Sequence, residues 1–165
     1  MSQTRRPLCV TMECMSTPHG IRMIDVGSKP VSLRTARASA RLRALPETIR
    51  RIQALELDKG DAIATARLAG IMAAKRTSDI VPLCHPLPID SVEVSLTFPE
   101  PDCVAIEAVV RATARTGVEM EALTAVTAAA LTIYDMCKSI DRGMSIEAVQ
   151  LEEKAGGSRG DYVRS

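Results

Sequence analysis

Apolar and polar side chains alternate along three stretches of the chain, which is the spacing of half-buried β-strands. Residues 33–42 place alanines and a leucine on one face and arginines and a serine on the other, although the alanines keep a helix open as an alternative. Residues 91–98 and 103–110 alternate in the same way and are joined by the turn sequence PEPD, so a β-hairpin is expected. The inward-facing residues of its first strand are predicted to be Val92, Val94, Leu96 and Phe98.

Helical periodicity marks other stretches. A short helix is expected from Pro46, because proline suits the first helical position, and one stripe of it would hold Ile49, Ile52 and either Leu55 or Glu56.

Two longer helices are expected further along. Asp61 is placed to cap the first, which lies within residues 59–77. The second is rich in alanine and covers residues 119–140. A last strand over residues 144–154 follows it, and residues 155–165 are expected to form a flexible, glycine-rich end.

The order of these elements predicts the fold class. One strand, two helices, a hairpin, a helix and a strand make an α+β domain of the split βαβ type, with an antiparallel sheet covered on one face by helices. Residues 23–165 are expected to form this single domain. Residues 1–22, which include His19, lack periodicity and are expected to be a flexible N-terminal tail.

Composition narrows the function classes. The formal net charge is +1, so no strong field favours nucleic acid or a membrane surface, and the two Tyr, one Phe and no Trp argue against stacking platforms for RNA. Residues 1–60 nevertheless carry 11 Lys and Arg against 5 Asp and Glu, so a ligand of that half would be anionic. Five cysteines without a CxxC pair predict reduced thiols and a cytoplasmic location.

The last predicted helix carries the strongest candidate chemistry. Asp135 and Lys138 are neighbours at i,i+3 in an otherwise apolar segment, which predicts a buried pair suited to proton transfer; a solvated ion pair is the alternative. Glu119 and Glu121 begin the same helix, where the dipole alone favours carboxylates. Glu121 and Asp135 are 14 residues apart, or about 21 Å along a helix, so a small ligand that touches both requires a second subunit.

A second candidate is the segment before the hairpin. Two prolines flank Cys84 and His85 and would hold the imidazole in a cleft, although a structural hydrogen bond is the alternative role. Adjacent ligands without a second spaced pair make a poor zinc set, so no metal site is expected. Lys75 closes a helix, where it either complements the dipole or binds an anion, and Lys59 is either a surface charge or a ligand contact.

Four blocks of sequence are similar to those of a known family. They read MIDVGSK, KGDAIATARLAGIMAAKRTSDIVPLCHPL, TGVEMEALTAVTAAALTIYDMCKSI and KAGGSRGDY. Together they resemble the cyclic pyranopterin monophosphate synthase family, the C protein of molybdenum cofactor biosynthesis. The resemblance implies a lyase that converts 3′,8-cyclo-7,8-dihydro-GTP to the pyranopterin and releases pyrophosphate. It also implies a ferredoxin-like subunit in a homohexamer, a trimer of dimers with sites near the dimer interfaces.

The resemblance assigns residues to this site by matching position. It makes Asp135, Lys59 and Lys138 catalytic. It also places Leu83, Cys84, His85, Met120 and Glu121 in the substrate site. Glu119, Lys75 and Lys154 are further expected substrate-binding residues, chosen for their charge and position rather than by the match. No cofactor is implied, although Mg²⁺ can accompany a triphosphate. The alternatives are a nucleotide-sensing module without catalysis, which needs no buried Asp135 and Lys138 pair, and an RNA-binding sheet, which needs exposed aromatic residues.

Overall fold

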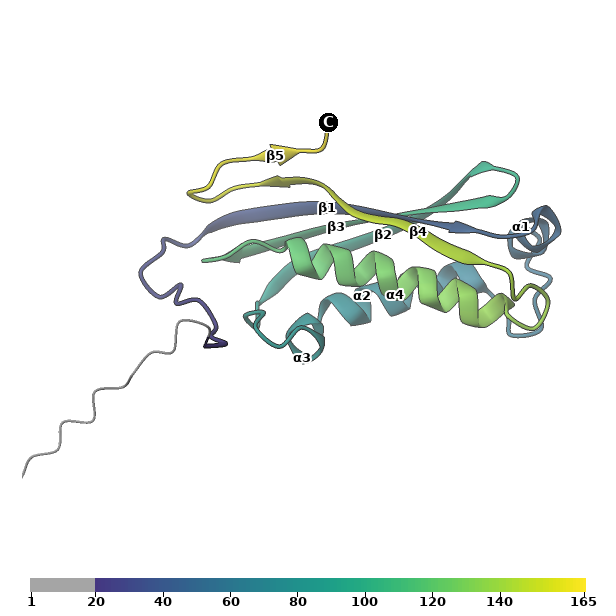
Figure 1. Ribbon diagram of the computed structural model, residues 1–165, viewed down its shortest axis with the longest axis horizontal. Coiled ribbons are helices and arrows are strands. Elements are labelled where there is room, and N and C mark those ends of the chain that lie inside the picture. Colours follow the sequence, from purple (N-terminus) through teal and green to yellow (C-terminus); the bar gives the residue numbers. More distant parts are fainter. Residues whose placement is uncertain (1–19) are drawn as a thin grey trace, which may run out of the picture.

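The computed structural model describes residues 20–165, so His19 and most of the predicted N-terminal tail lie outside the described residues. Residues 20–22 have no regular secondary structure. The elements in chain order, shown in Figure 1, are β1 (Ser32–Arg43), α1 (Pro46–Gln53), α2 (Ala62–Ala74), α3 (Thr77–Ile80), β2 (Ile89–Glu100), β3 (Cys103–Ala114), α4 (Glu119–Cys137), β4 (Ser145–Ala155) and β5 (Tyr162–Val163).

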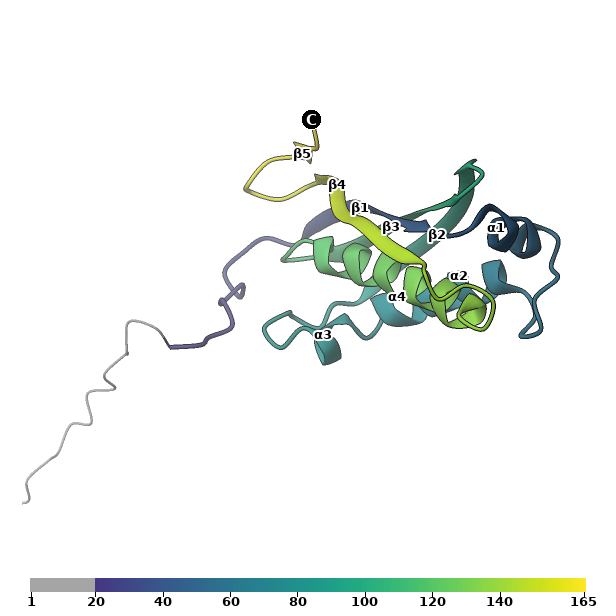
Figure 2. The ribbon, with the colours of Figure 1, turned by 45° about the vertical axis from the view of Figure 1, so that its right-hand side comes forward.

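The strands form one antiparallel sheet in the order β2-β3-β1-β4-β5. Its first four strands have the ferredoxin-like order, and α2 and α4 pack side by side on one face, as Figures 1 and 2 show. The predicted α+β class is therefore confirmed. Within the described residues, none of the helices combines the length and apolar character that a membrane crossing requires.

The central strand β1 settles the choice between strand and helix for residues 33–42. It pairs with β3 on one side and β4 on the other, so its backbone groups are satisfied in the sheet. Ala36, Ala38 and Leu42 face the helices and are fully buried. On the outer face, Arg37 contacts Glu107 at 2.8 Å and Glu153 at 2.7 Å. Much of the basic surplus of the N-terminal half is thus neutralised by neighbouring strands.

Small residues let α2 and α4 pack closely. The buried row of α2 is Ala62, Ala66, Gly70 and Ala74. A Cβ at Gly70 would lie only 3.0 Å from the carbonyl oxygen of Ala125 on α4, so glycine allows this approach. Asp61 caps α2 as predicted, because its Oδ1 accepts from the Ala64 N–H at 2.9 Å.

Two terminal details differ from the sequence-based expectations. Helix α1 starts at Pro46 and buries Ile49 and Ile52 as expected, but it ends at Gln53, and Leu55 is exposed with a φ of 59°. The glycine-rich C-terminal segment contains β5, which was not predicted. A strand of two residues is too short for alternation to reveal; its pairing with Glu153 and Lys154 on β4 fixes it instead.

Candidate functional site

The predicted site residues gather in two clusters at the two ends of α4. The C-terminal cluster consists of Lys59, Asp135 and Lys138. The N-terminal cluster lies about 21 Å away along the helix, at Glu119 and Glu121.

The C-terminal cluster is a network of two ion pairs that share Asp135. Lys138 Nζ lies 2.7 Å from Asp135 Oδ1, at the i,i+3 spacing of one helical turn. Lys59 arrives from the loop between α1 and α2, and its Nζ lies 2.7 Å from Asp135 Oδ2 and 3.0 Å from the Asp135 carbonyl oxygen. Both carboxylate oxygens of Asp135 therefore hold an ammonium group.

The prediction that Asp135 and Lys138 are buried is wrong for the single subunit. Their side chains are 55% and 56% exposed, and that of Lys59 is 45% exposed. The physical reason is that α4 turns only part of its circumference to the sheet and to α2; Leu131, on the outward row, is also exposed. Hydrogen bonds from Lys138 and then Lys59 lower the pKa of Asp135 to about 2, so its carboxylate stays ionised at neutral pH.

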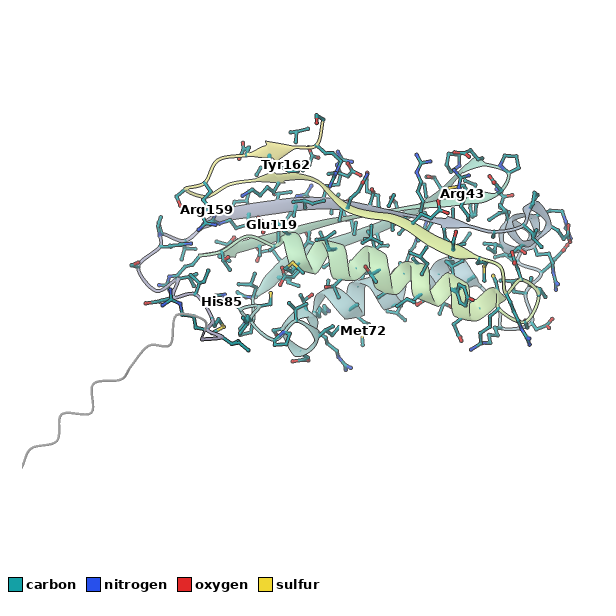
Figure 3. The ribbon with its side chains drawn as sticks, in the orientation of Figure 1. Arg43, Met72, His85, Glu119, Arg159 and Tyr162 are labelled. Carbon is teal, nitrogen blue, oxygen red and sulfur yellow. The ribbon has the colours of Figure 1, made fainter. Side chains whose placement is uncertain are left out.

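The N-terminal cluster lines a pocket between α4, the segment after α3 and the chain before β1. Leu83, Cys84, His85, Glu119 and Met120 all face it, which brings together five of the predicted substrate-binding residues. The other apolar residues of the lining are Ile24, Val26 and Val81. Figure 3 shows His85 and Glu119 at the same end of the molecule.

His85 is half-buried and tied to the chain before β1. Its Nε2 lies 2.8 Å from the carbonyl oxygen of Ile24, so the imidazole has a structural hydrogen bond as well as a place in the pocket wall. The two roles that the sequence left open are compatible, because the ring's other nitrogen remains for a ligand.

Glu121 sits behind this wall rather than in it. Its side chain is only 2% exposed and its Oε1 lies 3.6 Å from the Cys84 sulfur, while its Oε2 has no hydrogen-bond partner among the described residues. Burial raises the pKa of Glu121, and burial together with the Glu121 carboxyl raises the pKa of Cys84 to about 11. Cys84 is therefore a neutral thiol at physiological pH, placed between Glu121 and the pocket.

A second, basic pocket adjoins the first, and the two share part of their walls. The residues common to both are Lys29, Thr116, Gly117, Glu119 and Arg159. The basic pocket is further lined by Arg34, Thr35, Arg115, Lys154, Ala155, Gly156 and Ser158. Lys154 Nζ lies 3.6 Å from Glu119 Oε1, so the one carboxylate of this lining is already paired.

Several of these basic residues were not predicted. Lys29 and Arg159 belong to the blocks MIDVGSK and KAGGSRGDY, and the glycine-rich run GGSRGD was the only signal of phosphate binding among them. Arg34 falls on the same face of the alternating strand as the inward alanines, and no role was predicted for it. Lys75, by contrast, was predicted to bind substrate, but it is exposed at the C-cap of α2 and lines neither pocket. Across residues 20–165, no group of three or more His, Cys, Asp or Glu side chains is arranged to hold a metal ion.

Comparison with known proteins decides the family. The model of the MoaC family matches residues 23–157. The chain belongs to the MoaC family. It is 57% identical over 144 residues to cyclic pyranopterin monophosphate synthase 1 of Mycobacterium tuberculosis, covering 87% of this chain and 85% of that protein.

Other members of the family agree in length and identity. The cyclic pyranopterin monophosphate synthase of Thermomicrobium roseum is 55% identical, with 87% of each chain covered. That of a Roseiflexus species is 56% identical, covering 86% of this chain and 90% of its own. The family match begins where the predicted tail ends, includes both clusters, and ends at Gly157, within the glycine-rich run.

Proposed function

We propose that this chain is a cyclic pyranopterin monophosphate synthase of molybdenum cofactor biosynthesis, a lyase that converts 3′,8-cyclo-7,8-dihydro-GTP to cyclic pyranopterin monophosphate and releases pyrophosphate. The observation that carries the proposal is the 57% identity to a synthase of that name over 87% of the chain. The two pockets supply independent support, because their chemistry suits the two halves of such a substrate.

The substrate halves fit the two pockets as follows. The ring system lies against Leu83, Cys84 and Met120, in the apolar pocket. The triphosphate enters the adjoining basic pocket, where Lys29 and Lys154 place ammonium groups in its lining. Thr116, Gly117 and Glu119 form the wall that both pockets share, so one elongated ligand can occupy both.

Glu121 is assigned to accept hydrogen bonds from the ring half of the substrate, from its buried position behind Cys84. The guanidine-like edge of the ring offers N–H donors, and an unpartnered buried carboxyl oxygen is the acceptor that would match them. Because Cys84 stands between Glu121 and the pocket, this contact requires the thiol to move aside or to transmit the hydrogen bond. His85 faces the ligand from the apolar pocket with Nδ1, because its Nε2 is held by the Ile24 carbonyl oxygen, and Nδ1 can donate to a phosphate oxygen only when both ring nitrogens carry protons.

The lysine and aspartate cluster performs the proton chemistry in this proposal. Ring opening and reclosure need protons to be delivered and removed, which Lys59 and Lys138 do from positions fixed by the ionised Asp135. The low pKa of Asp135 makes it a poor proton donor, so its part is to orient the two ammonium groups. Lys75 lines neither pocket of its own subunit, so a contact with the departing pyrophosphate requires the Lys75 side chain to reach the pocket of a neighbouring subunit.

The site is shared between subunits. One substrate cannot span the roughly 21 Å between the ends of α4, and the exposed trio lines neither of the two pockets described above. A homohexamer built as a trimer of dimers, with each pocket facing the Lys59, Asp135 and Lys138 trio of a neighbour, completes the site. The cytoplasm is the proposed location, in keeping with the free cysteines Cys84, Cys103 and Cys137.

Pyrophosphate release tests the proposal directly. Purified protein is mixed with the cyclised dihydro-GTP intermediate, with Asp135→Asn alongside. Release by the wild type and little by the variant supports both the activity and the trio. Equal release by both keeps the enzyme and removes Asp135 from the chemistry. No release by folded wild-type protein would favour the nucleotide-sensing module. A buried Asp135 and Lys138 pair would have argued against that module, but the pair is exposed in the single chain.

A further inference from the structure

The glycine-rich run between β4 and β5 forms a closed hairpin loop. Gly156, Gly157 and Gly160 have φ values of 92°, 93° and 74°. The Asp161 side chain closes the loop at its base, since its Oδ1 accepts from the Gly156 N–H at 2.9 Å. Pairing of Lys154 with Tyr162 continues the hairpin beyond that point. The loop is thus held at both ends by hydrogen bonds.

This loop is seated directly on β1. A Cβ at Gly156 would lie 2.1 Å from the carbonyl oxygen of Leu33, and one at Gly157 would lie 1.5 Å from Arg34 Nη1. Arg34 itself is buried, and its Nε and Nη2 donate to the carbonyl oxygens of Ala114 and Arg115, each at 3.3 Å. Only glycine permits this contact, so the seat of the loop is fixed against a buried guanidinium.

Arg159 stands at the tip of this fixed loop and lines both pockets. Among the described residues, Arg159 makes no ion pair, and neither do Lys29 and Arg115 in the same lining. Figure 3 shows Arg159 at the end of the sheet where Glu119 lies. An uncompensated guanidinium at the junction of a basic pocket and an apolar pocket creates a positive potential where the two halves of a ligand would join.

We propose that Arg159 binds the triphosphate of the substrate where the two pockets meet, and that Asp161 is a positioning residue that holds the loop carrying it. This inference rests on the proposed function and extends it to residues that neither the helix periodicity nor the Cys84-His85 segment indicated. The glycines make the loop fit, Asp161 keeps it closed, and Arg159 supplies the planar donor fork that phosphate oxygens accept.

The first test separates binding from chemistry. Arg159→Ala is expected to raise KM for the cyclised dihydro-GTP about tenfold, and to leave kcat within about twofold, because the lost contact is made equally in the ground and transition states. Arg159→Lys should fall between this variant and the wild type. Arg67→Ala is the matched control, since it removes the same charge from an exposed position on α2 that lines neither pocket. An unchanged KM in Arg159→Ala overturns the proposal.

Inorganic tripolyphosphate provides a readout that does not depend on turnover. Calorimetric titration of the wild type should detect binding, and Arg159→Ala should weaken it by about tenfold, with a difference that shrinks as salt is added. Equal affinity in both proteins overturns the inference even if the enzyme is active. Arg159-dependent binding in a wild type that releases no pyrophosphate would support the phosphate contact and contradict the proposed reaction.

The KM values of two Asp161 variants test its positioning role. Asp161→Asn keeps an oxygen for the Gly156 N–H and should retain the wild-type KM, whereas Asp161→Ala should raise KM as Arg159→Ala does. The double variant with both alanines should be little worse than Arg159→Ala alone, because Asp161 acts through Arg159. Full additivity of the two effects, or loss of binding in Asp161→Asn, would contradict the positioning role.

Discussion

The two ends of α4 carry equally specific sequence motifs but very different physical environments. At the N-terminal end, Glu121 is 2% exposed and lies beneath a pocket with walls from four chain segments. At the C-terminal end, Asp135 is 55% exposed and holds two lysines on an open surface. Burial raises the pKa of the first carboxyl, and ammonium groups lower the pKa of the second to about 2.

This difference shows what each end lacks. The pocket can enclose a substrate but has no obvious pair for proton transfer apart from His85 and the Lys154 and Glu119 pair. The trio has the chemistry but no enclosure, and exposed ion pairs acquire catalytic strength only when water is excluded around them. Each end supplies what the other is missing, which is the physical argument for the proposed site between two subunits.

The largest expected effect is at the trio. Lys138→Ala and Lys59→Ala should each lower kcat by about a hundredfold to ten-thousandfold, because each removes a proton-transferring group. The melting temperature should hardly change, since both lysines are exposed in the single chain. Pyrophosphate release and thermal unfolding measure the two effects. Near-normal turnover by the folded variants would reduce the trio to a surface ion pair.

A smaller effect is expected at the pocket's glycine loop. Gly160→Ala places a side chain in open space at a φ of 74° and should cost about 1 kcal/mol, or roughly 3 °C in melting temperature. Gly156→Ala should cost clearly more, because its Cβ would meet the Leu33 carbonyl oxygen at 2.1 Å. The melting temperatures of the two variants separate two effects: Gly160→Ala adds backbone strain alone, whereas Gly156→Ala adds backbone strain and a steric clash. Equal melting temperatures would mean that the loop is not seated on β1.

The smallest expected effects are opposite in sign at the two carboxyls. A raised pKa means that the folded state binds the Glu121 proton more tightly, so wild-type stability falls as pH rises from the ordinary value of 4.5 towards the raised one. The stability of Glu121→Gln relative to the wild type should therefore improve as pH rises above the ordinary value of 4.5. Thermal unfolding across this range checks the trend, and a gap that does not change with pH would contradict the buried environment.

Asp135 provides the reverse case. Its lowered pKa contributes stability above the ordinary value of 3.8, and that contribution is lost as pH falls towards about 2. Asp135→Asn should thus lose its small disadvantage in acid, and added salt should erase the difference because the group is exposed. Salt-independent behaviour would place the trio in a dry environment even in the isolated subunit.

The sequence predicted these two regions unequally. The i,i+3 spacing correctly placed Lys138 beside Asp135, but Lys59 is 76 residues from Asp135 and only the family resemblance joined it to the pair. Apolarity all around α4 predicted burial, and the structure leaves the row with Leu131 open, because a periodic pattern cannot distinguish a core from a surface that another chain covers.

The pocket was harder to predict than the sheet. Alternation predicted β1, β2 and β3 well, since each has one face on a continuous core. The basic lining draws on residues before β1, after β3 and after β4, which meet only because those strands are neighbours in the sheet order. Arg34 and Arg159 line the basic pocket because of that topology, which no local spacing encodes.

Subunit complementation tests the shared site most directly. Lys138→Ala disables the trio and Lys154→Ala disables the pocket, so each variant alone should be nearly inactive. When the two are co-expressed with different tags and mixed oligomers are isolated, about a quarter of the sites should combine an intact pocket with an intact trio from a neighbour, and pyrophosphate release should recover to roughly that fraction. Mixed oligomers that remain as inactive as either parent would contradict a site built from two subunits.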